Sequence, residues 1–149
     1  MNLDAYPYTI SDDHLIYTFD SFGPNGKIRK TVRYRLRNRG GLAYFNLGFG
    51  DLDPVTGNVD DRAVSNNSDK EKVLATVAAT VLDFICTFPD ALVYAQGSTS
   101  ARTRLYQMGI STNWNEISSL LQVYGYVFDS GWQPYEKNVN YFGFLARRK

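Results

Sequence analysis

The turn sequence Gly23-Pro24-Asn25-Gly26 lies between two segments, 15–22 and 27–37, in which apolar and polar residues alternate. Alternation with a period of two is typical of a β-strand that has one buried face. Asn-Gly between such segments favours a two-residue type I′ turn, because both central positions of that turn need positive φ. The chain therefore predicts a β-hairpin whose two turn residues are Asn25 and Gly26.

This turn fixes which side chains face one another across the hairpin. On one face the pairs are Leu15 with Leu36, Tyr17 with Tyr34, and Phe19 with Val32; on the other they are Thr18 with Arg33, Asp20 with Thr31, and Phe22 with Arg29. One face is apolar and the other polar, as in a sheet covered on one side. His14, the only histidine, lies beside Arg37 in this register, and we expect a surface or hydrogen-bonded side chain rather than a catalytic one.

The remaining sequence predicts further strands and three helices. A polar loop, 50–67, precedes a helix that Ser68 and Glu71 begin as a capping box. The other expected elements are an edge strand at 6–10, strands at 43–49, 91–96, 126–128 and 139–145, a helix that GSTS begins and Gly109 ends, and a helix from 113 to 125. We expect a single α+β domain over residues 1–149, with an N-terminal antiparallel β-meander followed by helices packed on one face of the sheet.

The composition agrees with one globular domain. The chain has 149 residues, of which 44% are hydrophobic and 21% charged, so it can bury a core. The net charge of +1 indicates no partner by itself. Cys86, the one cysteine, excludes an intrachain disulfide, and its apolar neighbours predict a buried thiol. The sequence shows neither a signal peptide nor an apolar stretch of membrane-spanning length, so we expect a cytoplasmic protein that does not contact a membrane.

The stretch Gly97-Ser-Thr-Ser100 connects an apolar strand to a helix. Free amide groups and the helix dipole favour an anion at a helix start, and small residues let a ligand approach the backbone. Arg102 and Arg104 lie about 200° apart on the helix, so only one of them can face a ligand closely. The sequence predicts an anion site formed by Gly97, Ser98, Thr99, Ser100, Arg102, Arg104 and Tyr106; the alternative is a plain helix cap with solvated arginines.

Several named sites do not match this stretch or its surroundings. A P-loop requires a lysine directly after its glycine-rich turn, and no lysine follows the turn here. The strand-Gly-Ser-helix pattern resembles the opening of nucleotidyltransferases. That family then uses an Asp-x-Asp pair to hold Mg²⁺, whereas Glu116 is the only acidic residue in positions 105–125 of this sequence. Asp51 and Asp53 lack the later oxygen ligands of a calcium loop. We expect no metal and no cofactor.

The second hairpin segment carries basic residues at odd positions: Lys27, Arg29, Arg33, Arg35, Arg37 and Arg39. In a strand, all of them project from one face. Lys and Arg contact phosphates, and aromatic side chains nearby can stack on bases. The sequence therefore predicts a nucleic-acid surface at Arg29, Arg33, Arg35 and Arg37. The alternative is a solvated sheet face balanced by acids such as Asp20, or by Asp53, Asp60 and Asp61 of the long loop.

Three stretches together resemble one family. They are Phe45-Asn-Leu-Gly-Phe-Gly-Asp51, Asp69-Lys-Glu-Lys-Val-Leu-Ala-Thr-Val-Ala78 and Gly97-Ser-Thr-Ser-Ala-Arg-Thr-Arg-Leu-Tyr106. The family they resemble is an uncharacterised group of small proteins from Bacteroidetes-type bacteria, a domain of unknown function. The resemblance implies a single domain and no particular activity.

These features favour a binding protein for a phosphate-bearing partner, either nucleic acid or nucleotide. Two other classes stay open. One is a small enzyme directed at RNA or nucleotides, such as the toxin of a toxin–antitoxin pair, with Tyr106 and Asp51 as candidate residues. The other is an interaction module whose arginines bind an acidic protein. The sequence assigns no catalytic residue and no oligomeric state.

Overall fold

The computed structural model describes residues 4–61 and 67–149. Within these ranges the strands are β1 (Thr9–Ile10), β2 (Ile16–Gly23), β3 (Gly26–Arg39), β4 (Leu42–Leu52), β5 (Val59–Asp60), β6 (Val93–Ala95), β7 (Leu121–Val127), β8 (Gly131–Pro134) and β9 (Gly143–Arg148). The helices are α1 (Lys70–Thr87), α2 (Ser100–Thr112) and α3 (Trp114–Leu120).

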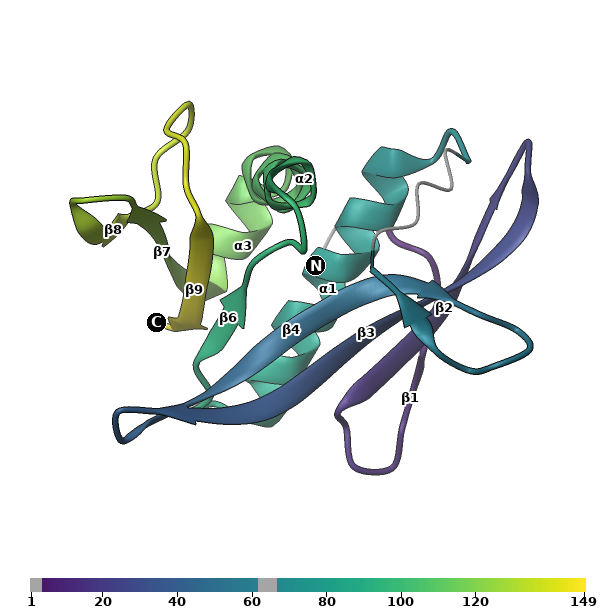
Figure 1. Cartoon of the computed structure of the whole chain (residues 1–149), viewed down its shortest axis with the longest axis horizontal. Helices are drawn as coiled ribbons and strands as arrows, with labels where there is room; N and C mark the ends of the chain where they lie inside the picture. The colour runs from purple at the N-terminus through teal and green to yellow at the C-terminus, as the bar shows by residue number, and fades with distance from the viewer. Residues whose placement is uncertain (1–3, 62–66) are drawn as a thin grey trace.

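All of these strands belong to one sheet, and the helices pack on one face of it (Figure 1). The order across the sheet is β1-β2-β3-β4-β6-β9-β7-β8, and β5 pairs with β4. The pairing of β4 with β6 is parallel, because α1 crosses between them, and the other strand pairs in the described residues are antiparallel. The N-terminal meander and the one-sided helices confirm the α+β prediction.

The hairpin of β2 and β3 forms, but the predicted register was wrong by two residues. Gly23 pairs with Gly26, so the turn residues are Pro24 and Asn25. Proline fixes φ at about −65°, which suits the first central position of a type I turn and excludes type I′. Gly26 then adopts the positive φ, 81°. Pro24, rather than the Asn-Gly pair, sets the turn.

The shift of two residues leaves the faces of the hairpin unchanged, because side chains alternate with a period of two. Tyr17, Val32 and Tyr34 project toward the helices and are at most 1% exposed. The ring of Tyr34 stacks on Phe84 of α1, with the two ring centroids 4.0 Å apart. The apolar face predicted from the sequence is therefore the face that α1 covers.

The second helix begins where the sequence predicts and ends later. Thr99 is the N-cap of α2, and the helix runs through Gly109 to Thr112. Gly109 is buried, and a Cβ built on it would lie 3.3 Å from the Cβ of Leu74 in α1. This glycine allows two helices to approach each other instead of ending one of them, so the prediction that it ends the helix was wrong.

The last helix is shorter than predicted, since a strand replaces its second half. α3 ends at Leu120, and the chain continues as β7 in place of the helix expected as far as Gly125. Leu121 and Val123 are buried, whereas Gln122 between them is exposed, which is the alternation of a strand. Antiparallel pairing with β9, which follows later in the chain, decides this conformation.

The start of α1 also differs from the predicted capping box. The N-cap is Asp69, which forms no side-chain cap hydrogen bond, and Ser68 has a φ of 60°. The Asp69 carboxylate instead accepts hydrogen bonds from Tyr6 Oη at 2.7 Å and from Ser21 Oγ at 2.5 Å. The beginning of α1 is therefore held by the hairpin and the N-terminal segment.

Cys86 lies on the exposed side of α1, so the prediction of a buried thiol was wrong. Its neighbours Phe84 and Ile85 are at most 1% exposed and face the core. An apolar sequence neighbourhood does not bury every position of an amphipathic helix, because successive residues are rotated around the helix axis.

Asn67 connects the hairpin turn to the start of α1, and we predict that Asn67→Ala lowers the free energy of unfolding by about 1–3 kcal/mol. The Asn67 side chain is buried; its Oδ1 accepts from the Asn25 N–H at 2.8 Å and its Nδ2 donates to the Gly26 carbonyl at 2.9 Å. Urea denaturation measures the loss. Asn58→Ala, at an exposed loop position, should change stability little, and equal effects of both substitutions would contradict this role.

Candidate functional site

The turn before α2 has the predicted strand-to-helix shape, and several of its polar groups bond within the protein. The Gly97 N–H donates to Thr103 Oγ1 at 3.0 Å, and Thr103 Oγ1 donates to the Thr99 carbonyl at 3.2 Å. Thr99 Oγ1 accepts from the Arg102 N–H at 3.2 Å, as an N-cap does. The Gly97 N–H and the Thr99 hydroxyl, which the sequence predicts to face an anion, instead form hydrogen bonds that stabilise the first turn of α2.

The small residues of this turn have a structural reason. A Cβ on Gly97 would lie 2.4 Å from the backbone nitrogen of Thr103, so only glycine lets the turn pack against α2. Ser98 Oγ donates to the carbonyl of Asp61 at 3.1 Å, which ties the turn to the segment after β5. The Ser100 side chain is exposed. Anion binding by residues 97–100 stays a prediction.

Arg102 and Arg104 have different surroundings. The Arg102 guanidinium donates to the Phe49 carbonyl at 3.2 Å and lies 5.6 Å from the centroid of the Phe49 ring, so it holds α2 against β4. Arg104 is exposed. Tyr106 lies one turn after Arg102, and burial raises the pKa of its hydroxyl to about 12, so this group is protonated at neutral pH.

Three of the predicted residues, Thr99, Arg102 and Tyr106, line a cleft of about 1000 Å³ between the N-terminal parts of α1 and α2. The other charged residues that line the cleft are Lys30, Lys70, Lys72, Asp4, Asp69 and Glu71. Lys30 is 5% exposed, and its Nζ bonds to Asp51 Oδ1 at 2.5 Å. Because charges of both signs face the cleft, it does not present a purely basic surface to an anion.

The arginines of β3 lie on the face of the sheet that the helices leave uncovered. Figure 1 shows this side, with β3 and β4 crossing in front of α1. Arg35 and Arg37 are exposed, and Arg33 is half-buried. None of these three forms an ion pair within residues 4–61 and 67–149. Arg29 differs, since its Nε donates to Asp20 Oδ1 at 3.1 Å.

The described part of loop 50–67 does not neutralise these arginines. Asp53 accepts the backbone N–H groups of Val55 and Thr56, which lowers the pKa of its carboxyl. Asp60 lies in β5, where it pairs with Asp51 beyond the Arg33–Arg37 part of the sheet. Residues 62–66 lie outside the described ranges. No carboxylate in the described part of the loop therefore forms an ion pair with Arg33, Arg35 or Arg37.

Arg33 carries an unsatisfied donor. Its Nε is buried and has no hydrogen-bond partner among the described residues. Arg33 lies between Ile16 of β2 and Gly48 of β4, and neither of these cross-strand neighbours has a side-chain acceptor. A buried donor without an acceptor is unusual in a native structure and requires an explanation.

A row of aromatic side chains continues this face across the sheet, and the sequence alone does not predict it because its members come from four separate strands. The row consists of Tyr44 on β4, Tyr94 on β6, Tyr126 on β7 and Trp132 on β8. The rings meet edge-on, with centroids 5.9 Å apart for Tyr44 and Tyr94, 6.1 Å for Tyr94 and Trp132, and 5.3 Å for Tyr126 and Trp132. Tyr44 pairs with Arg37, so the aromatic row begins beside the arginines.

We call the surface formed by Arg33, Arg35, Arg37 and this aromatic row the open face. The cleft beside α2 lies on the other side of the sheet, because its lining residues Lys30 and Phe49 alternate with the residues that project from the open face. The two sets of residues predicted from the sequence are therefore separate surfaces.

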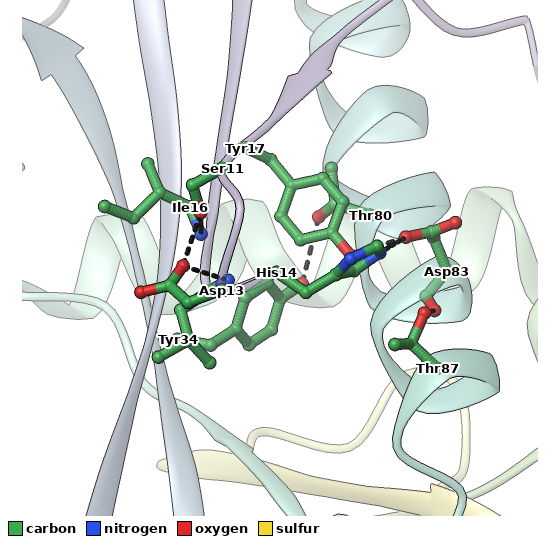
Figure 2. A network of polar contacts seen from close by, with 10 residues as sticks. Ser11, Asp13, His14, Ile16, Tyr17, Tyr34, Thr80, Asp83 and Thr87 are labelled. Carbon is green, nitrogen blue, oxygen red and sulfur yellow. Dashed lines mark hydrogen bonds and ion pairs between the residues drawn. The ribbon is translucent and has the colours of Figure 1, made fainter.

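His14 takes part in a polar network on the helix side (Figure 2). The residue has a φ of 66°, and its Nε2 lies 3.1 Å from Asp83 Oδ2 of α1. Tyr17 Oη donates to the same oxygen at 2.6 Å, and burial together with this carboxylate raises the pKa of Tyr17. His14 is hydrogen-bonded, as expected, but its neighbour is Asp83 and not Arg37; the network attaches the loop before β2 to α1.

An apolar cavity of about 80 Å³ lies between the helices and the sheet. Tyr106 is the one residue with a polar side-chain group among those that line it, so the cavity offers little to orient a polar ligand. The described residues contain no group of three or more His, Cys, Asp or Glu that could hold a metal ion. They also contain no helix that is long and apolar enough to cross a membrane.

We predict that Thr99→Ala destabilises the protein by about 1 kcal/mol, because it removes the N-cap acceptor of α2. Ser100→Ala is the matched control, since it removes a neighbouring exposed hydroxyl that is not the cap. Chemical denaturation of both variants measures the difference. If Ser100→Ala were as destabilising as Thr99→Ala, the capping assignment would be wrong.

Comparison with known proteins identifies a family. No curated protein and no solved structure matches the chain. The matching family is described as "Family of unknown function (DUF6934)", and the match extends over residues 2–149. A match over nearly the whole length agrees with the resemblance drawn from the sequence, whose bacterial group stays a prediction. The chain therefore belongs to this family of unknown function.

Proposed function

We propose that the protein binds nucleic acid, and that the open face contacts the phosphate backbone. The observation that carries this proposal is the set Arg33, Arg35 and Arg37, which lies on an uncovered sheet face without a carboxylate partner in the described residues. Arginine suits phosphate because its planar guanidinium donates two hydrogen bonds to one anion. The Nε of Arg33 is buried without a partner among the described residues, so a phosphate reaches this donor only after the Arg33 side chain moves.

The open face supports phosphate binding better than the turn before α2 does. Gly97 and Thr99 use their polar groups within the protein, and Arg102 bonds to Phe49. The cleft that Arg102 lines also contains carboxylates. The second candidate function is binding of a nucleotide phosphate in this cleft, with Arg102 and Thr99 as its contacts. Titration of the protein and of the Arg102→Ala variant with phosphate tests it.

The structure gives less support to the two other functional classes, a nucleotide-directed enzyme and a module that binds an acidic protein. Tyr106 and Asp51 were the candidate residues of a nucleotide-directed enzyme. Tyr106 has a raised pKa, and Asp51 bonds to Lys30, so neither is a ready base or nucleophile at neutral pH. An acidic protein would use the same arginines as nucleic acid. Competition between an oligonucleotide and an acidic polypeptide separates these two partners.

We predict that the double substitution Arg35→Ala and Arg37→Ala weakens oligonucleotide binding uniformly across base sequences. For every phosphate that the variant no longer neutralises, the slope of log K against log salt concentration should become shallower by about 0.7–0.9, because fewer counterions are released. Fluorescence anisotropy at several salt concentrations measures the affinity and the slope.

Lys137→Ala is the control for this experiment, because Lys137 is an exposed cation in the loop between β8 and β9. It should leave affinity and slope close to those of the unmodified protein. Absence of binding to any oligonucleotide at low salt would refute the proposed function, and an unchanged salt slope in the double variant would remove the open face from it.

A further inference from the structure

We infer that the nucleic acid bound by the open face is single-stranded, with its bases stacked on the aromatic row formed by Tyr44, Tyr94, Tyr126 and Trp132. This inference rests on the proposed function, since it specifies the form of the same partner. Proteins that hold single strands combine basic side chains along the backbone with aromatic rings on which bases stack, because every base has a π-face.

The row crosses the sheet from β4 to β8, but its rings lie closer together than the strands that carry them. Tyr44 and Trp132 both pack against Tyr94, with ring centroids 5.9 Å and 6.1 Å from it, so the two outer rings lie at most about 12 Å apart. The row starts beside Arg37, because Tyr44 pairs with Arg37 across β3 and β4. Phosphates on the arginines and bases on the rings can therefore belong to one continuous strand that crosses the sheet.

The rings are held in place before any ligand binds. The Tyr94 hydroxyl donates to Gln96 Oε1 at 2.6 Å, and the Tyr94 ring covers Gly143, where a Cβ would lie 2.6 Å from the hydroxyl oxygen. Trp132 contacts both Tyr94 and Tyr126. Rings fixed in this way lose little conformational entropy when a base stacks on them.

Trp132 is the most accessible member of the row, with 44% of its surface exposed. Trp132 lies on the edge strand β8, on the same face of the sheet as the arginines of β3, so its exposed surface faces the same side as they do. Bases within a duplex are stacked on one another and cannot lie on these rings. The aromatic row therefore favours single strands, whereas the arginines alone would accept either form.

The test compares single-stranded DNA and RNA of about 12 nucleotides, within the range that one stacking domain covers, with a duplex of the same length. Trp114→Phe is used as the background, since it leaves Trp132 as the only tryptophan of the two in the chain. We expect tighter binding of the single strands and a change in Trp132 fluorescence with the single strands only.

Three variants at two positions assign the effect to stacking. Trp132→Leu should weaken single-strand binding about 5- to 150-fold, the loss expected from about 1–3 kcal/mol for one stacked base, whereas Trp132→Phe keeps a ring and should retain most of the affinity. Phe22→Ala is the matched control, because Phe22 is an exposed aromatic residue at the far end of β2. Thermal unfolding confirms that each variant is folded.

The outcomes separate this inference from the proposed function. Equal affinity for duplex and single strand, with no effect of Trp132→Leu but with weaker binding on Arg35→Ala and Arg37→Ala, overturns the inference and leaves the function. No binding of either form overturns both. The comparison of the two nucleic-acid forms uses the unmodified ring, so it decides the matter even if a Trp132 variant fails to fold.

Discussion

The packing of α1 on the β2–β3 hairpin determines which side of the sheet is left for a partner. Tyr34 stacks on Phe84 at 4.0 Å and shares a 3.0 Å hydrogen bond with Thr80, so both its ring and its polar tip are satisfied against the helix. Burying each ring contributes about 1.5–3 kcal/mol. Since side chains alternate along a strand, burial of Tyr34 on one face places Arg33 and Arg35 on the other. The open face is therefore a consequence of the core.

The sequence predicts those parts of the fold that depend on local pattern. The two faces of the hairpin follow from the period of two and survive the wrong register, because the error was an even number of residues. The N-cap at Thr99 is likewise a local feature. The sequence predicts a helix for residues 121–125 of β7 because their apolar residues fit either period, and the strand there is decided by β9, about twenty residues later in the chain. Gly109 could not be interpreted without Leu74, which packs against it.

The candidate site likewise has one part that follows from local sequence and another part that depends on the arrangement of distant strands. The arginines of β3 share one segment, so the sequence places them on a common face before the structure is known. Tyr44, Tyr94, Tyr126 and Trp132 come from four strands, and only the sheet order brings them together. The turn at 97–100 shows the opposite problem, since glycine and hydroxyl residues suit a phosphate loop and a capped helix equally well. The hydrogen bonds of Gly97 and Thr99 identify its structural role.

Net charge is a poor guide to this protein, because its charges are unevenly distributed. The overall value of +1 suggests no preference for a polyanion. On the open face, however, Arg33, Arg35 and Arg37 repeat every second residue, about 7 Å apart, which is within the Debye length at physiological salt. Each neighbouring pair repels by about 0.6 kcal/mol even in bulk water. No carboxylate among the described residues forms an ion pair that relieves this repulsion. A phosphate chain lying along the strand would relieve it at all three positions, which is why the local arrangement, rather than the total charge, favours a nucleic-acid partner.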